Sequence, residues 1–233
     1  MNKLVLFDID GTLVTGKTGH KQAFINGFKE VFGLETELDW DTVQGMTDQQ
    51  IITTILLRHG FLEEEIKRKM LACLAVMEKS FQESILTSEV KILGGVVELL
   101  TNLKAKNYLL GLVTGNLIKI ARIKLGKVGL WDFFDVGGFG SDDIYRSNLV
   151  KLAIQRAGEK HNFVWDKNVI LFGDTPLDVK AGQEAGVATI GVTTGVHTRK
   201  NLEDIGAGAV VDSLEDTDDI LKLINSIYYD DLN

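Results

Sequence analysis

The sequence predicts an α/β protein with a doubly wound, mainly parallel Rossmann-like sheet and an inserted all-helical cap domain. Short, almost entirely apolar runs alternate with segments of helical spacing, which is typical of a parallel sheet covered on both faces. From about Gly16 to about Glu89 this alternation stops, and the chain carries only helical patterns. A helical insertion after the first strand accounts for that break.

The expected strands are short and apolar: residues 4–7, 108–113, 133–136, 168–172, 188–192 and 209–211. The expected core helices show apolar residues at helical spacing: residues 96–106, 149–161, 177–185 and 214–227. In a doubly wound fold the functional site lies at the carboxyl ends of the strands. Polar residues that directly follow a strand are therefore the first candidates for function.

The helical segment contains three expected helices, residues 20–33, 47–60 and 63–85. Gly16 and Gly19 before it, and the polar stretch 87–91 after it, have the composition of hinges. We therefore expect two domains: a catalytic core formed by residues 1–15 and 88–233, and a helical cap formed by residues 16–87.

Composition and charge exclude several classes of protein. The chain has 233 residues, 45% of them hydrophobic, which is enough for a sizeable core. The formal net charge of −8 argues against nucleic acid or an anionic membrane as partner, and no apolar stretch approaches the length of a membrane span. Cys73 is the only cysteine, so no internal disulfide is expected. The apolar run 4–7 is too short for a signal peptide, and we expect a cytoplasmic protein.

Acidic side chains and a threonine follow three of the expected strands. Asp8 and Asp10 end the first strand in LFDIDGTL, where two like charges beside a core cost free energy unless something compensates them. Thr114 follows the second strand in VTGN, and Asp174 and Asp178 lie in GDTPLD after a later one. Because parallel strands end at one edge of the sheet, these residues are expected to converge.

Such a cluster suits phosphoryl chemistry. Asp8, the backbone carbonyl of Asp10 and Asp174 offer oxygen ligands for Mg²⁺, which binds substrate phosphate in turn. Asp8 is placed to attack phosphorus, and Asp10 to protonate the leaving oxygen and later deprotonate water. Thr114 and a cation would hold the nonbridging oxygens.

The candidate cations lie in GSDDIYRSNLVK, residues 140–151. Arg146 directly precedes the expected helix, and Lys151 lies further along it. We favour Arg146 as the phosphate-binding cation, with Lys151 as the alternative.

The motifs DIDGT, VTGN and GDTPLD, in this order and spacing, resemble those of the haloacid dehalogenase-like hydrolase superfamily. The resemblance covers essentially the whole chain, including the cap, and is greatest to the phosphoglycolate phosphatase and β-phosphoglucomutase group. It implies Asp8 as nucleophile, Asp10 as acid/base and Asp174 as metal ligand, with Asp178 in a supporting role. The family's usual Lys-Pro pair after the third strand is absent, since Pro176 is the only proline.

The same resemblance extends to the phosphate-binding loop and the cap. Thr114, Gly115 and Asn116 match the loop that binds phosphate. Cap residues GMTDQQ resemble the family's specificity loop, so Thr47 and Asp48 are expected either to contact the leaving group or simply to begin a helix. His20, near the cap hinge, is a further candidate for substrate contact.

The function expected from these residues is Mg²⁺-dependent hydrolysis of a small phosphorylated metabolite. A phosphotransferase or mutase with the same aspartyl-phosphate remains open. A phospho-aspartate signalling domain is a third alternative, although such domains carry their phosphorylated aspartate on a later strand and have no long helical insertion. Dehalogenation is disfavoured because the family's dehalogenases lack the aspartate present here as Asp10.

Overall fold

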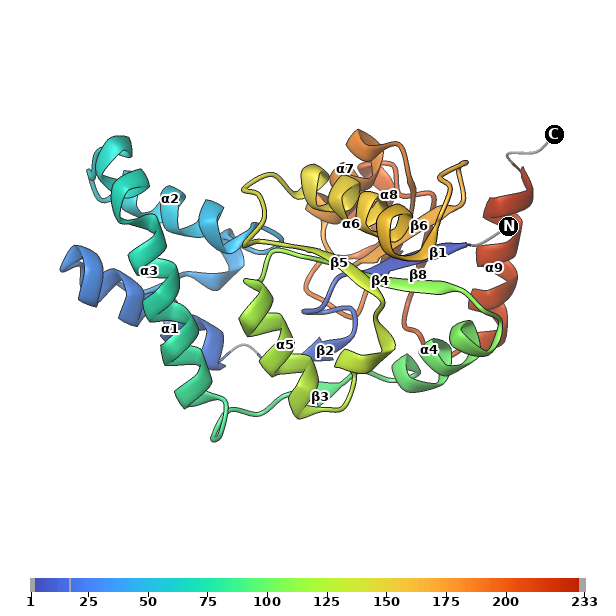
Figure 1. Cartoon of the computed structure of the whole chain (residues 1–233), viewed down its shortest axis with the longest axis horizontal. Coiled ribbons are helices and arrows are strands. Elements are labelled where there is room, and N and C mark those ends of the chain that lie inside the picture. Colours follow the sequence, from blue (N-terminus) through green and yellow to red (C-terminus); the bar gives the residue numbers. More distant parts are fainter. Residues whose placement is uncertain (1–2, 17, 231–233) are drawn as a thin grey trace.

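The computed structural model describes residues 3–16 and 18–230 and contains a six-stranded parallel sheet with helices on both faces (Figure 1). The spatial order of the strands is β5-β4-β1-β6-β7-β8, and every neighbouring pair is parallel. Their bounds are β1 Leu4–Phe7, β4 Leu109–Thr114, β5 Val136–Phe139, β6 Val169–Gly173, β7 Ala188–Val192 and β8 Ala209–Val211. The predicted doubly wound α/β fold is confirmed.

The central strand β1 shows why these runs lack polar alternation. Leu4 and Leu6 pack against the helices of one face, whereas Val5 and Phe7 pack against those of the other, and all four side chains are fully buried. The first face carries α6 (Arg146–His161) and α7 (Pro176–Ala185), and the second carries α4 (Val96–Ala105), α5 (Ile118–Lys127) and α9 (Thr217–Asp230). A short helix, α8 (Arg199–Asp204), precedes β8.

The inserted segment is helical and lies at one end of the molecule (Figure 1). Its elements are α1 (Thr18–Gly27), the π-helical turn η1 (Phe28–Phe32), the 3₁₀ turn η2 (Trp40–Thr42), α2 (Asp48–Arg58) and α3 (Glu63–Ser84). They share an apolar cluster that includes Phe24, Ile52 and Met77, and Leu117 and Ile120 from the edge of the core join it. The insert therefore has its own packing centre and also rests on the start of α5.

A small antiparallel pair lies where the insert leaves and rejoins the core. It joins β2 (Val14–Thr15) to β3 (Lys91–Ile92). The predicted domain boundaries, after residue 15 and before residue 88, fall beside this pair, and the division into two domains stays a prediction.

The prediction of a strand at residues 133–136 is wrong. Residues 131–133 form a 3₁₀ turn, η3 (Trp131–Phe133), and β5 begins only at Val136. Phe133 and Phe134 are apolar because they pack on the core from this turn. The strand has the sequence VGGF, and its two glycines hide the apolar pattern of a strand. Glycine is required at Gly138 because the backbone of Leu149 leaves no room for a side chain there. The helix expected from residue 149 also begins earlier, at Arg146.

Candidate active site

Asp8 lies directly after β1, where it is buried between a cation and other carboxylates. Its backbone N–H donates to the Phe172 carbonyl oxygen at 2.9 Å, which extends the pairing with β6 by one residue. Its carboxylate lies 2.6 Å from Arg146 Nη2, which is also 2.6 Å from Asp178 Oδ1. Burial raises the pKa of Asp8 to about 7, and the opposing charge of Arg146 offsets that rise only in part.

Asp10, two residues further on, is held by a different cation. Lys124 Nζ donates to both carboxylate oxygens, at 2.8 and 2.7 Å, and Asn116 Nδ2 donates to Oδ2 at 2.8 Å. Burial by itself would raise the pKa of Asp10, but the Lys124 ammonium outweighs it and the pKa lies below its usual value. The pKa values of the two aspartates are therefore shifted in opposite directions despite their proximity.

Lys124 is the site residue that the sequence reasoning missed. It extends from α5, is fully buried, and also donates to Asn116 Oδ1 at 2.9 Å. A signal was present, because Lys124 follows Ile120 by four residues and Ala121 by three and thus lies on the apolar face of the helix. A lysine on such a face requires an acidic or polar partner inside the protein.

The expected phosphate-binding loop follows β4 at the same edge of the sheet. Thr114 is fully buried, and its hydroxyl oxygen accepts from Asn116 N at 3.2 Å and Asn116 Nδ2 at 2.7 Å. The carbonyl oxygen of Gly115 accepts from the Asp48 N–H at 2.9 Å. A side chain at Gly115 would collide with the backbone of Met46, so only glycine allows the cap loop to pack this closely.

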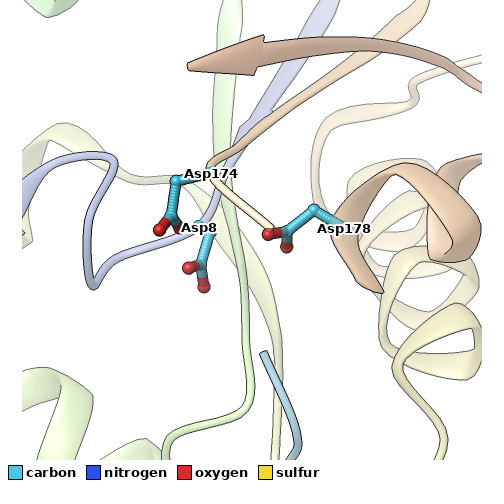
Figure 2. A group of neighbouring side chains, drawn as sticks. All are labelled: Asp8, Asp174 and Asp178. Carbon is cyan, nitrogen blue, oxygen red and sulfur yellow. The ribbon is translucent and has the colours of Figure 1, made fainter. Parts of the chain in front are cut away.

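Asp174 and Asp178 complete an acidic cluster with Asp8. Oxygen atoms of the three carboxylates lie within 4.8 Å of one another, and Figure 2 shows Asp178 extending from α7 toward the other two. Asp178 Oδ2 accepts from the Thr175 N–H at 3.0 Å and from its hydroxyl at 2.7 Å. Burial, followed by the charges of Asp178 and Asp8, raises the pKa of Asp174 to about 9.

The donor set of this cluster fits a divalent cation. All three carboxylates are buried, and Asp174 Oδ1 has no hydrogen-bond partner in the described part of the chain. Asp178 differs, because its two oxygens face Thr175 and Arg146. Asp8 and Asp174 therefore have the freer oxygens for a metal, and Asp178 is better suited to positioning its neighbours.

Arg146 and Lys151 are separated by the geometry of α6. Arg146 is the first residue of the helix, is buried, and also donates to the carbonyl oxygens of Gly45 at 3.0 Å and Val113 at 3.3 Å. Lys151 is exposed and does not line the pocket. Five residues correspond to about 140° beyond a full turn. The expectation that Lys151 could replace Arg146 at the site is therefore wrong.

The cap reaches the pocket through His20 and Asp48. His20 Nε2 lies 3.2 Å from the Asp48 carboxylate, which also accepts the Leu117 N–H at 2.9 Å. Thr47 does not line the pocket. Its hydroxyl accepts from Gln50 N and donates to the Ile144 carbonyl oxygen, so it begins α2 and ties the helix to the core.

A cavity of about 50 Å³ lies between these groups. From the core it is lined by Asp8, Asp10, Thr114, Gly115, Asn116, Arg146, Asp174 and Thr175. From the cap it is lined by His20, Trp40, Val43, Gln44, Gly45, Met46, Asp48 and Ile51.

Comparison with known proteins identifies the family to which the chain belongs. The family model described as haloacid dehalogenase-like hydrolase matches residues 5–192, from the first strand to β7. The chain belongs to this family. The predicted resemblance and the enzyme class are thereby confirmed, and the hydrolase is related to proteins named as phosphatases.

Relatives of the hydrolase match along almost its whole length. It is 29% identical to "Probable phosphatase IndB" of Dickeya dadantii, over 93% of this chain and 92% of that protein. It is 27% identical to pyrimidine 5'-nucleotidase YjjG of Escherichia coli, over 93% and 96% of the two chains. A solved hydrolase from Pseudomonas syringae has the same fold, with a TM-score of 0.74, 20% identity, and 96% and 99% coverage. Among the described residues, no helix of the hydrolase is long and apolar enough to span a membrane.

Proposed function

We propose that this hydrolase is a Mg²⁺-dependent phosphatase that cleaves a small phosphomonoester through an aspartyl-phosphate on Asp8. The observation that carries the proposal is the contrast between two carboxylates at the end of β1. Asp8 lies in the acidic cluster beside Arg146, whereas Asp10 is held by Lys124. The family match supports this chemistry, and relatives named as a phosphatase and a 5'-nucleotidase support hydrolysis.

Asp8 and Asp174 would hold the magnesium ion, together with the backbone carbonyl of Asp10. When bound, the ion supplies the positive charge that ionises these carboxylates and neutralises substrate phosphate. Without this positive charge, the pKa values of Asp8 and Asp174 are raised. Asp178 keeps Thr175 and Arg146 in position around the cluster.

In the first step, an oxygen of Asp8 attacks phosphorus while the bond from phosphorus to the leaving oxygen breaks. Arg146, Thr114 and the backbone of Gly115 surround the position of the phosphoryl group and stabilise its nonbridging oxygens. Asp10 gives its proton to the leaving oxygen. The phosphate dianion favours that protonated form, because added negative charge beside a carboxylate raises its pKa.

In the second step, Asp10 acts as the base. It takes a proton from a water molecule, whose oxygen attacks phosphorus as the bond to Asp8 breaks. Inorganic phosphate leaves and the Asp8 carboxylate is restored. The Lys124 ammonium stabilises Asp10 in the ionised form that this step requires.

The test is hydrolysis of p-nitrophenyl phosphate by the purified chain. We expect turnover with Mg²⁺, none with EDTA, and a loss of at least about 1,000-fold in kcat for Asp8→Asn. Lys151→Met is the matched control, since it removes a charge on an exposed face of α6 and should leave turnover unchanged. Turnover in EDTA equal to that in Mg²⁺, or an active Asp8→Asn variant, would contradict the proposal.

A further inference from the structure

The part of the pocket that would receive the leaving group is formed by the cap and contains an apolar wall. Trp40, Val43, Met46 and Ile51 supply its apolar side chains. They come from η2, from the loop before α2 and from α2 itself, and all four belong to the apolar cluster of the cap. This wall faces the core loop that follows β4.

The wall lies beside the position of the proposed nucleophile. Asp8 and the four wall residues line the same cavity. A phosphoryl group beside Asp8 therefore brings the leaving group of the substrate next to the cap residues.

The cations around the cavity are already engaged by carboxylates. Among the described lining residues, only Arg146 and His20 can carry positive charge. Arg146 pairs with Asp8 in the core, and His20 pairs with Asp48 in the cap. Lys124, behind the cavity, binds Asp10.

A second negative charge on the substrate is poorly accommodated here. It would lose hydration against the apolar wall without gaining a free cation, which is costly for an ionised group. The Asp48 carboxylate, buried on the same side of the cavity, would repel it as well. An uncharged alcohol meets neither obstacle and gains apolar contact with Trp40 and Met46.

We infer that the leaving group of the substrate is an uncharged alcohol, and that the wall formed by Trp40, Val43, Met46 and Ile51 selects it over anionic leaving groups. This inference rests on the proposed function. Monoesters whose remainder carries a carboxylate or a second phosphate are poor substrates of this chain, whereas monoesters of neutral alcohols are good ones.

The test compares 2-hydroxyethyl phosphate with 2-phosphoglycolate, which differ in a neutral hydroxymethyl group against a carboxylate. With Mg²⁺ present, we expect kcat/KM of the wild-type chain to be at least 10-fold higher for 2-hydroxyethyl phosphate. Equal values, or a preference for 2-phosphoglycolate, would overturn the inference and leave the proposed function standing. Hydrolysis of neither ester, together with no turnover of p-nitrophenyl phosphate, would overturn both.

A charge placed on the wall provides the second arm. Met46→Lys adds an ammonium facing the cavity, and we expect it to shift the ratio of the two kcat/KM values at least 5-fold toward 2-phosphoglycolate. Leu71→Lys is the matched control, because Leu71 lies on α3 of the same cap and is 80% exposed. An equal shift in both variants would mean that the overall charge of the cap, rather than the wall, sets the preference, which contradicts the inference. The wild-type comparison decides the matter even where Met46→Lys fails to fold.

Discussion

Lys124 and Asp10 form an ion pair whose two members are 114 residues apart in sequence. The lysine lies on the inner face of α5, and both of its hydrogen-bond partners, Asp10 and Asn116, line the cavity. A buried ammonium in this position serves two purposes. It keeps the pKa of Asp10 low, and it fixes the carboxylate next to Asn116 in the loop after β4.

Replacing Lys124 by methionine tests this role. We expect kcat/KM for p-nitrophenyl phosphate to fall about 100-fold or more, the range typical of a lost acid–base contribution. The limb of the pH–rate profile that Asp10 governs should move to higher pH, because the charge that lowers its pKa is gone. Lys151→Met makes the same chemical change on the exposed face of α6 and should behave as wild type. A variant that folds, with an unchanged profile and rate, would rule the role out.

At the scale of elements, β5 is an edge strand whose outer backbone groups are covered by side chains. Arg156 Nη1 donates to the Gly137 carbonyl oxygen at 2.6 Å, and Asp142 Oδ2 accepts from the Phe139 N–H at 2.9 Å. The two side chains are joined by two further hydrogen bonds, of 2.7 and 2.8 Å. This pair occupies backbone groups that would otherwise be free to join another chain.

Asp142→Ala should destabilise the chain without changing catalysis. We expect the free energy of unfolding in urea to fall by about 1–3 kcal/mol, the cost of leaving polar partners unsatisfied. Burial opposes ionisation of Asp142, but its hydrogen bonds to Arg156 and Phe139 lower its pKa overall. The contribution of Asp142 to the free energy of unfolding is therefore fully present above the pKa of an aspartate in the unfolded chain, about 4. It is lost progressively as the pH falls from that value through the lower pKa of the folded chain. Glu159→Ala, exposed on α6, is the control; a loss that is equal at pH 3 and pH 6 would argue against this account.

At the scale of the whole molecule, the cap and the core meet at the active site through polar contacts from one short segment. Between Gly45 and Gln49, backbone and side-chain groups bind the core loops after β4 and β5 and the start of α6. The contacts are Arg146 to the Gly45 carbonyl, Thr47 to the Ile144 carbonyl, the Asp48 N–H to the Gly115 carbonyl, and Gln49 to the Gly140 carbonyl. In this arrangement the cap loop lies over the end of the cavity that contains Asp8 and Asp174. If the proposed function holds, this contact shields phosphoryl transfer from bulk water.

Stability of the whole chain should depend on pH and metal through the acidic cluster. Asp8 and Asp174 have pKa values of about 7 and about 9, above the value of about 4 in the unfolded chain. The folded metal-free chain therefore holds more protons than the unfolded chain, and its free energy of unfolding falls as the pH rises from about 4 to about 9. Mg²⁺ binds the ionised carboxylates, so it should stabilise the chain more at pH 8 than at pH 5.

The measurement is urea unfolding at pH 5, 7 and 9, in EDTA and in Mg²⁺. Asp174→Asn isolates the effect, because it removes one of the two carboxyl groups with a raised pKa and, at the same time, a proposed metal ligand. In EDTA, we expect the free energy of unfolding of the wild-type chain to fall relative to that of the variant as the pH rises. A difference independent of pH, or equal stabilisation of both proteins by Mg²⁺, would count against the metal site.

The sheet and the residues at its edge could be predicted from local sequence. Apolar runs buried on both faces are a local property, as are the polar residues at their carboxyl ends. Asp8, Asp10 and Asp174 follow strands, and Thr114 is the last residue of β4. Strands that end at the same edge place these residues together in any doubly wound fold. The strand VGGF was missed because its two glycines have low β propensity, and at Gly138 glycine is required by the close approach of Leu149 on α6, a tertiary contact.

The pairs of charges that meet inside the site depend on how the helices pack and could not be predicted from local sequence. Lys124 reaches Asp10 because α5 turns its apolar face toward the sheet, and Lys151 points away because of its position around α6. The pairing of His20 with Asp48 likewise depends on how α1 and α2 pack within the cap. Side-chain partners far apart in sequence are fixed by the rotation and packing of whole helices, which no single segment encodes.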